Sequence, residues 1–118
     1  MNNKDNKIAD NRIEKSKKKI AKIDESIDIE KNKLKKIDNI QEEFVSLNKS
    51  INRCIELLSS SIKGTKTNHM LDEMFNNNNN LLKNVSSVLD EEKEETKKNI
   101  SELYYQKTET QEKLKKEE

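Results

Sequence analysis

The side chains that most often do chemistry are sparse in this chain of 118 residues. His69 is its single histidine and Cys54 its single cysteine, so neither has a like neighbour with which to hold a metal, and no disulfide can form within the chain. We expect Cys54 to be a small buried or half-buried apolar residue. The sequence contains no glycine-rich phosphate loop and no serine nucleophile elbow. It therefore predicts a protein that is not an enzyme and uses no cofactor or metal.

A basic run at Lys15, Lys17, Lys18 and Lys19 offers a contact for nucleic acid or anionic lipid, as a weaker alternative function. Acidic residues follow it closely and no aromatic side chains are interleaved as stacking platforms, so we expect no nucleic-acid binding. No apolar run approaches the ~18 residues that span a bilayer, and we expect no membrane insertion. The first residues lack the apolar segment of a secretory signal peptide. The expected location is the cytoplasm, with export by a signal-peptide-independent route left open.

The elements that position these residues follow from one glycine, Gly64, and the lack of proline. Long stretches without a helix-breaking residue flank Gly64, and glycine is the residue best suited to a left-handed helix stop. The sequence predicts an all-α fold, a long antiparallel two-helix hairpin that turns at Ile62, Lys63 and Gly64. The expected order is a frayed N-terminus at residues 1–7 and one hairpin domain at 8–115, with helices at about 8–62 and 69–115 and a turn at 63–68.

Two features of the second helix need separate expectations. Asp72 and Glu73 are expected in its first turn, where carboxylates suit the helix dipole. Five asparagines, Asn76 to Asn80, lower the helix preference at that point. Because Met74 and Leu81 keep a seven-residue step across the run, we expect the helix to continue through it.

Apolar residues of the first helix recur every seven residues at two positions, which makes a narrow stripe. Glu30, Gln41 and Asn48 break this repeat, and such polar residues either set the register or are tolerated defects. From Ile40 onward a third apolar column widens the stripe, which predicts more than one neighbouring helix. The expected contacts with a partner are Ile40, Phe44, Leu47, Ile51, Leu81, Val85 and Leu89.

The balance of charge favours folding back. Residues 1–23 hold eight lysines or arginines and three acids, an excess of +5, whereas residues 90–118 hold ten acids and seven lysines, a net of −3. An antiparallel hairpin brings these ends together, although each exposed pair contributes little. Ordering each residue costs roughly 1.5 kcal/mol, which a single row of Ile and Leu hardly offsets. We therefore expect a partner, which is either a second copy or a foreign protein.

The central Ile62-Lys63-Gly64 and the segment Tyr105-Gln106-Lys107-Thr108-Glu109 carry a resemblance to a known family. The chain resembles the W-x-G helical-hairpin proteins of type VII secretion, with isoleucine in place of the tryptophan and with Tyr105 and Glu109 matching the Y-x-x-x-[DE] export motif. Within that group it looks most like the small helical partner proteins of LXG toxins in Gram-positive bacteria. The resemblance implies a targeting adaptor that binds the helical N-terminal domain of such a toxin.

A second hypothesis needs no foreign partner. The heptad repeat through Ile13, Ile20, Ile27 and Leu34 is also typical of a self-associating coiled-coil scaffold, so a homodimer is left open.

Overall fold

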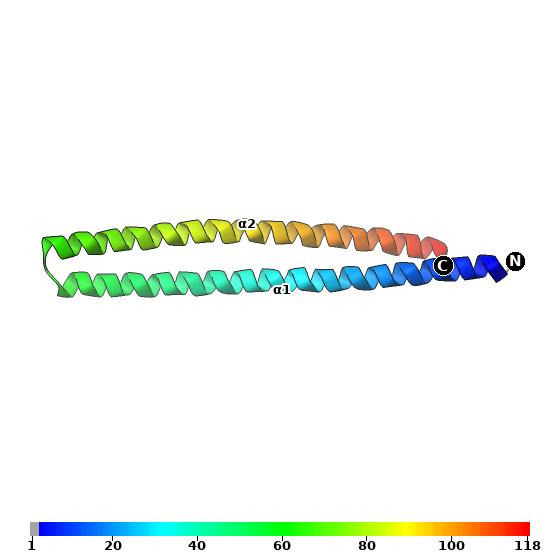
Figure 1. Cartoon of the computed structure of the whole chain (residues 1–118), viewed down its shortest axis with the longest axis horizontal. Coiled ribbons are helices and arrows are strands. Elements are labelled where there is room, and N and C mark those ends of the chain that lie inside the picture. The colour runs from blue at the N-terminus through cyan, green and yellow to red at the C-terminus, as the bar shows by residue number, and fades with distance from the viewer. Residues whose placement is uncertain (1–2) are drawn as a thin grey trace. The chain divides into compact units, whose positions relative to one another are not determined.

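The computed structural model describes residues 3–118, with side-chain environments from residue 6 onward. Helix α1 spans Asn3–Ser61 and helix α2 spans Thr65–Glu117, with residues 62–64 between them (Figure 1). No strand is present in this part of the chain. The all-α helical hairpin predicted from the sequence is therefore confirmed.

The helices are longer than expected and the turn is shorter. Helix α1 begins at Asn3 rather than near residue 8, so residues 3–7 of the expected frayed segment are helical, whereas residues 1 and 2 lie outside the described residues. Helix α2 begins at Thr65 rather than near residue 69 because the backbone oxygen of Gly64 accepts a hydrogen bond from the Asn68 amide at 2.9 Å. Gly64 is thus the N-cap of α2, a position that glycine tolerates.

The expectation of a left-handed stop at Gly64 was wrong. No described residue, glycine included, has a positive φ. Helix α1 ends on an ordinary bond in which the Ile62 amide donates to the Leu58 oxygen at 2.9 Å. The early start of α2 also places Asp72 and Glu73 beyond its first turn, which holds no acidic residue. The turn therefore depends on capping by the Gly64 carbonyl and not on glycine's access to left-handed backbone.

The asparagine run Asn76–Asn80 lies within α2, and the helix continues through it as predicted. Neither α1 nor α2, over the residues that the structure describes, holds a stretch long and apolar enough to cross a membrane.

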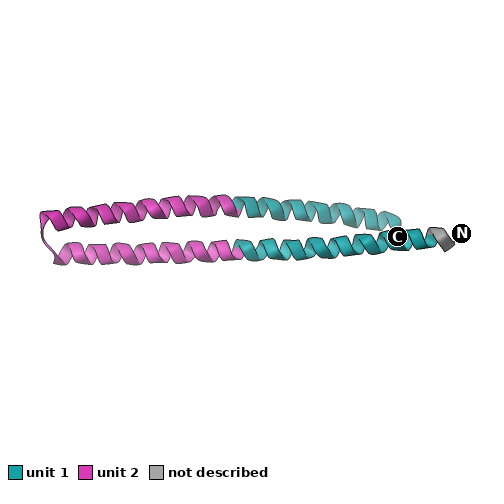
Figure 2. Ribbon diagram, viewed as in Figure 1, with its two compact units in different colours: residues 1–34, 94–118 teal, residues 35–93 magenta. Residues whose placement is uncertain are grey.

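The chain divides into two compact units (Figure 2). We call the unit made by the chain up to Leu34 and by Glu94–Glu118 the terminal unit. Its buried residues are Ile23, Ile27, Thr96 and Thr110. The Thr110 hydroxyl donates to the Gln106 backbone oxygen at 2.8 Å, so this buried polar group is satisfied within its own helix. Lys107 of α2 forms an ion pair with Asp24 of α1 at 2.8 Å.

We call the unit Lys35–Lys93 the turn unit. Ile37, Ile55 and Leu71 form its apolar core, and Asn48 is buried among the core positions. Lys93 of α2 is 2.6 Å from Asp38 of α1, and the Gln41 amide donates to Asp90 at 3.1 Å.

In the ion pairs Asp24–Lys107 and Asp38–Lys93, the lysine belongs to α2 and the acid to α1. Neither acid lies in residues 1–23, so the attraction expected between residues 1–23 and 90–118 stays a prediction. Each ion pair requires that one lysine and one acidic residue face each other across the two helices of a unit. The summed charge of a segment does not show which residues do so.

Candidate functional site

Large apolar side chains are exposed mainly in the turn unit. In the terminal unit the exposed members are Ile8, Ile29, Tyr104 and Tyr105. In the turn unit they are Ile40, Leu47, Ile51, Leu57, Leu58, Ile62, Met70, Met74, Phe75, Leu81 and Val88. Concentrations of exposed apolar surface of this kind mark interaction sites in soluble proteins.

Most of the exposed apolar residues on the α1 side of the turn unit share one line with the half-buried Phe44 and with Ile62, which lies just beyond the end of α1. The exposed Leu57 is the exception and lies about 100° away from this line. An α-helix turns by about 100° per residue, and on this geometry the seven residues of the line deviate from it by no more than about 40° around the helix axis. They are Ile40, Phe44, Leu47, Ile51, Cys54, Leu58 and Ile62. The buried residues Ile37, Asn48 and Ile55 lie about 60–80° further round the helix, in the direction of increasing residue number. The exposed line is therefore distinct from the core but borders on it.

Helix α2 repeats this arrangement. Met70, Met74, Leu81 and Val88 lie within about 20° of one line, and the buried Leu71 lies about 80° further round, again in the direction of increasing residue number. Because the two helices are antiparallel, the same sense of offset on each places both exposed lines on the same side of the hairpin. We call this combined surface the apolar face.

The predicted contact residues divide between this face and its border. Ile40, Leu47, Ile51 and Leu81 are exposed on it, with Leu47 and Leu81 retaining 56% and 53% of their accessible surface. Three others, Phe44, Val85 and Leu89, are half-buried, and of these Leu89 falls nearest the core-facing line. The structure also leaves Met70, Met74 and Val88 exposed here, which sequence reasoning missed. Met74 follows Met70 by four residues, and Leu81 and Val88 then follow at steps of seven, which was the available signal.

The middle of the apolar face is almost free of charge, although charged residues make up 40% of the chain. Residues 44–52 contain one charged residue, Lys49, and residues 74–89 contain one, Lys83. Both lie about 180° from the exposed lines, on the opposite side of the hairpin. Depletion of charge is the compositional mark of an interface core, so this window has the character of a contact surface.

An asparagine layer holds the helices together beneath this face. Asn48 Nδ2 donates to the Asn78 backbone oxygen at 3.2 Å, and Asn78 Nδ2 donates to Asn52 Oδ1 at 3.0 Å. Asn52 Nδ2 lies 3.3 Å from Asn48 Oδ1 and 3.1 Å from Asn79 Oδ1. The break at Asn48 and the run at Asn76–Asn80 are therefore two sides of one layer. Such a layer favours a single register, and the register in turn sets the two exposed lines side by side.

Cys54 was expected to be buried or half-buried, but it is exposed. Cys54 belongs to the third apolar column with Ile40 and Leu47, and this column follows the exposed line and does not face α2. Its free thiol therefore reports on that surface.

The other candidate residues from the sequence, namely His69, the pair Tyr105 and Glu109, and the turn residues, lie in different parts of the chain. His69 Nε2 lies 3.2 Å from Glu73 Oε1 on the exposed surface of α2. No group of three metal-binding side chains occurs among the described residues. Tyr105 is 67% exposed, and Glu109, one turn further along α2, is also exposed. Both lie inside α2, and the turn residues Ile62, Lys63 and Gly64 are all exposed.

No family model matches the chain, and no curated protein and no solved structure match it. The W-x-G and LXG resemblance therefore depends on the residues quoted for it and stays a prediction.

Proposed function

We propose that this protein is a non-enzymatic adaptor that binds a helical protein partner across the apolar face. The observation that supports the proposal is the placement of two exposed apolar lines, one from each helix, on one side of the hairpin. A helical hairpin laid on two such lines buries both and completes a four-helix arrangement. The charge-poor window suits close packing, because few ions would have to be desolvated there.

The resemblance supplies a class of partner for this proposal. We propose that the partner is the helical N-terminal domain of an LXG-type toxin and that the adaptor presents this toxin for type VII secretion. Tyr105 and Glu109 are the export candidates, since both are exposed on one face of α2. Of the seven contact candidates, Leu47 and Leu81 lie at the centre of the charge-poor window and are both exposed.

The alternative of a self-associating scaffold was based on the heptad repeat of the first helix. The structure buries several residues of that repeat, Ile23, Ile27, Ile37 and Ile55, against α2 of the same chain. Contacts within one chain thus account for much of the pattern that suggested self-association. This is why we favour a foreign partner on the apolar face.

The test is co-expression with the helical N-terminal domain of each toxin encoded beside this gene, followed by size exclusion with light scattering. We expect a stable complex containing both chains. Leu47→Asp and Leu81→Asp should each weaken it about 100-fold or more, since each sets a charge in a desolvated interface. Lys49→Asp and Lys83→Asp, on the opposite side, are matched controls and should leave the complex intact.

The natural thiol gives a second readout without any mutation. Alkylation of Cys54 by iodoacetamide should slow markedly when the partner is bound, because Cys54 lies on the apolar face. Failure of every neighbouring domain to bind, or equal loss with the Lys49 and Lys83 controls, would contradict the proposal. A tight homodimer that ignores the toxin domain would instead support the scaffold.

A further inference from the structure

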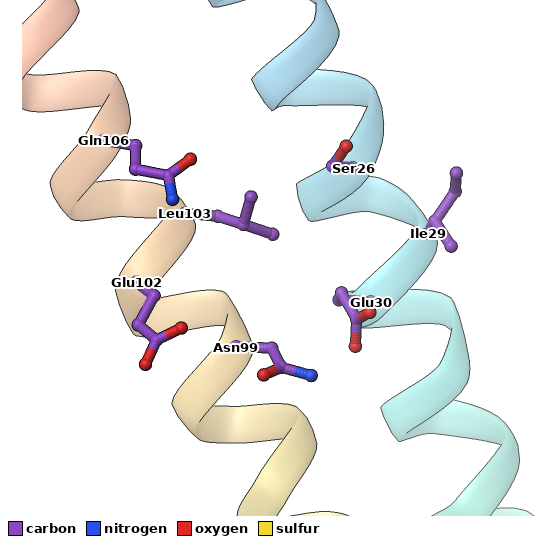
Figure 3. A pocket seen from close by; sticks show the side chains of 7 residues that line it. All are labelled: Ser26, Ile29, Glu30, Asn99, Glu102, Leu103 and Gln106. Atoms are coloured by element: carbon purple, nitrogen blue, oxygen red, sulfur yellow. The ribbon is translucent and has the colours of Figure 1, made fainter.

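A hollow of about 310 Å³ opens between the helices of the terminal unit (Figure 3). Its lining residues are Ser26, Ile29, Glu30, Asn99, Glu102, Leu103 and Gln106. Leu103 and Asn99 project from α2 towards α1, and Glu30 lies opposite on α1 (Figure 3). The volume is at the lower end of the range of small-ligand sites, roughly 300–1,000 Å³, so the hollow suits one side chain and not an extended ligand.

Glu30 is an acidic residue at a heptad position that is apolar and buried in the neighbouring repeats. Ile23 and Ile37 hold the same heptad position seven residues before and after it, and both are buried with 6% and 7% of their surface accessible. A carboxylate at this position is half-buried, and its Oε2 is buried without a hydrogen-bond partner. Such an oxygen carries a desolvation penalty that a donor would remove.

The rest of the lining indicates what that donor is. Ile29 and Leu103 offer apolar surface, whereas Glu102 adds a second carboxylate and Asn99 and Gln106 add amide oxygens. Lysine and arginine side chains combine an aliphatic stem with a cationic, donor-rich tip. Hydrogen bonds from such a tip to a carboxylate are among the stronger ones in proteins.

We infer that this hollow is a binding site for a lysine or arginine side chain presented by a protein partner. The aliphatic stem lies against Ile29 and Leu103, and the cationic tip donates to Oε2 of Glu30, with the Glu102 carboxylate nearby. The inference goes beyond the proposed function, because it concerns the terminal unit and requires neither the apolar face nor an LXG domain. It gives the misplaced Glu30 a role that packing does not.

The test is an NMR titration of the full chain with two probes, n-butylammonium for lysine and n-butylguanidinium for arginine, to ~50 mM, since fragments of this size bind weakly. We expect amide shifts centred on residues 26–30 and 99–106 with at least one probe, and the tighter probe identifies the preferred side chain. n-Butanol, which has the stem without the charge, should bind at least 10-fold more weakly.

Glu30→Gln keeps the shape and removes the charge, so it should weaken binding of the cation at least 10-fold. Glu117→Gln is the matched control, because Glu117 Oε2 is likewise buried without a partner in the described chain. Its hollow is lined by Arg12, Lys15, Lys19 and Lys113, which repel a cation. We expect that variant to bind within twofold of the unmodified protein, and circular dichroism should show both variants folded.

The inference is overturned if neither cation shifts the hollow's amides, or if n-butanol binds as well as the cations. Equal binding by the Glu30→Gln variant, or equal shifts at acidic residues all along the helices, would overturn it as well. None of these outcomes bears on the apolar face, so failure here and failure of the proposed function are distinguishable.

Discussion

Asn48 and Asn78 exchange hydrogen bonds between the two helices, each through its side-chain amide. Asn48 Nδ2 donates to the Asn78 backbone oxygen at 3.2 Å, and Asn78 Nδ2 approaches the Asn48 backbone oxygen at 3.4 Å. Apolar side chains tolerate a slip of one helical turn, because one isoleucine replaces another. A reciprocal amide pair does not, since a slip leaves a buried amide unsatisfied.

Replacement of both residues, Asn48→Leu with Asn78→Leu, should raise thermal stability and lower structural uniqueness. Removing both partners of a buried polar pair is often neutral or stabilising, here by about 1–2 kcal/mol. With Cys54→Ser as background, spin labels at residues 49 and 83 should give one narrow distance in the parent and a broader distribution in the double variant. A distribution that stays narrow would show that apolar contacts alone set the register.

Ile27 and Ile29 form a natural matched pair. Ile27 is 3% exposed and Ile29 is 65% exposed, two residues apart on the same helix. Ile27→Ala should lower the free energy of unfolding by about 2–4 kcal/mol, through lost burial and the cavity left behind. Ile29→Ala should change it by less than about 0.5 kcal/mol, as is usual for surface positions. Urea unfolding followed by circular dichroism measures both, and similar losses would contradict the assigned core.

Gly64→Ala should be tolerated, in contrast to the usual need for a glycine at a helix stop. The Gly64 φ is not positive, and an added Cβ would meet Thr67 Oγ1 only at an ordinary 3.9 Å. Alanine also has fewer conformations to lose on folding, an effect of about 0.4–1 kcal/mol. Alanine caps a helix less well than glycine, which opposes this gain. We expect a net change within about 1 kcal/mol, measured by thermal melting, whereas a loss of several kcal/mol would indicate strain at the turn.

The pKa of Lys31 lies above its ordinary value because of Tyr104, through a side-chain hydrogen bond and through electrostatic attraction. The Lys31 ammonium also lies 5.4 Å from the centre of the Tyr104 ring. A raised pKa in the folded state means that the contact stabilises the protein below the unfolded pKa of about 10.4 and that this contribution is lost as pH rises through the folded pKa.

Tyr104→Phe should therefore shift the Lys31 titration, followed by NMR at its side-chain carbons, back towards about 10.4. Tyr105→Phe is the control on the neighbouring ring and should leave the titration unchanged. An unaltered Lys31 midpoint in the Tyr104 variant would show that the ring contact has no effect on the ammonium.

The hairpin follows from the sequence because its causes are local. One glycine and no proline leave no other place for a helix to end, and the heptad steps identify Ile23, Ile27, Ile37 and Ile55 as a seam. The helix boundaries are harder to predict from the sequence, because the start of α2 depends on a hydrogen bond from the Asn68 amide to the Gly64 carbonyl. That hydrogen bond depends on backbone geometry and leaves no trace in composition.

The roles of the polar residues in the hairpin become clear only when the contacts between the two helices are known. In the sequence, Asn48 interrupts the apolar repeat of the first helix, and Asn76–Asn80 lower the helix preference of the second. In the fold, these asparagines form hydrogen bonds with each other between the two helices. The sequence likewise marks Glu30 as a break in the repeat, but its buried oxygen follows from the lining that α2 supplies. The exposure of Ile40, Leu47, Ile51 and Leu81 is compatible with their expected role, which stays a prediction.

The scarcity of charge between residues 44–52 and 74–89 has a kinetic consequence. Long-range attraction cannot guide a partner to a neutral surface, so association there should proceed at about 10⁵–10⁶ M⁻¹s⁻¹. Sodium chloride should hardly alter that rate, and sulfate should tighten the complex by strengthening burial of apolar surface. Although lysine and glutamate are abundant towards both ends of the chain, the proposed partner would thus associate by unsteered diffusion and shape complementarity, at a rate that depends little on ionic strength.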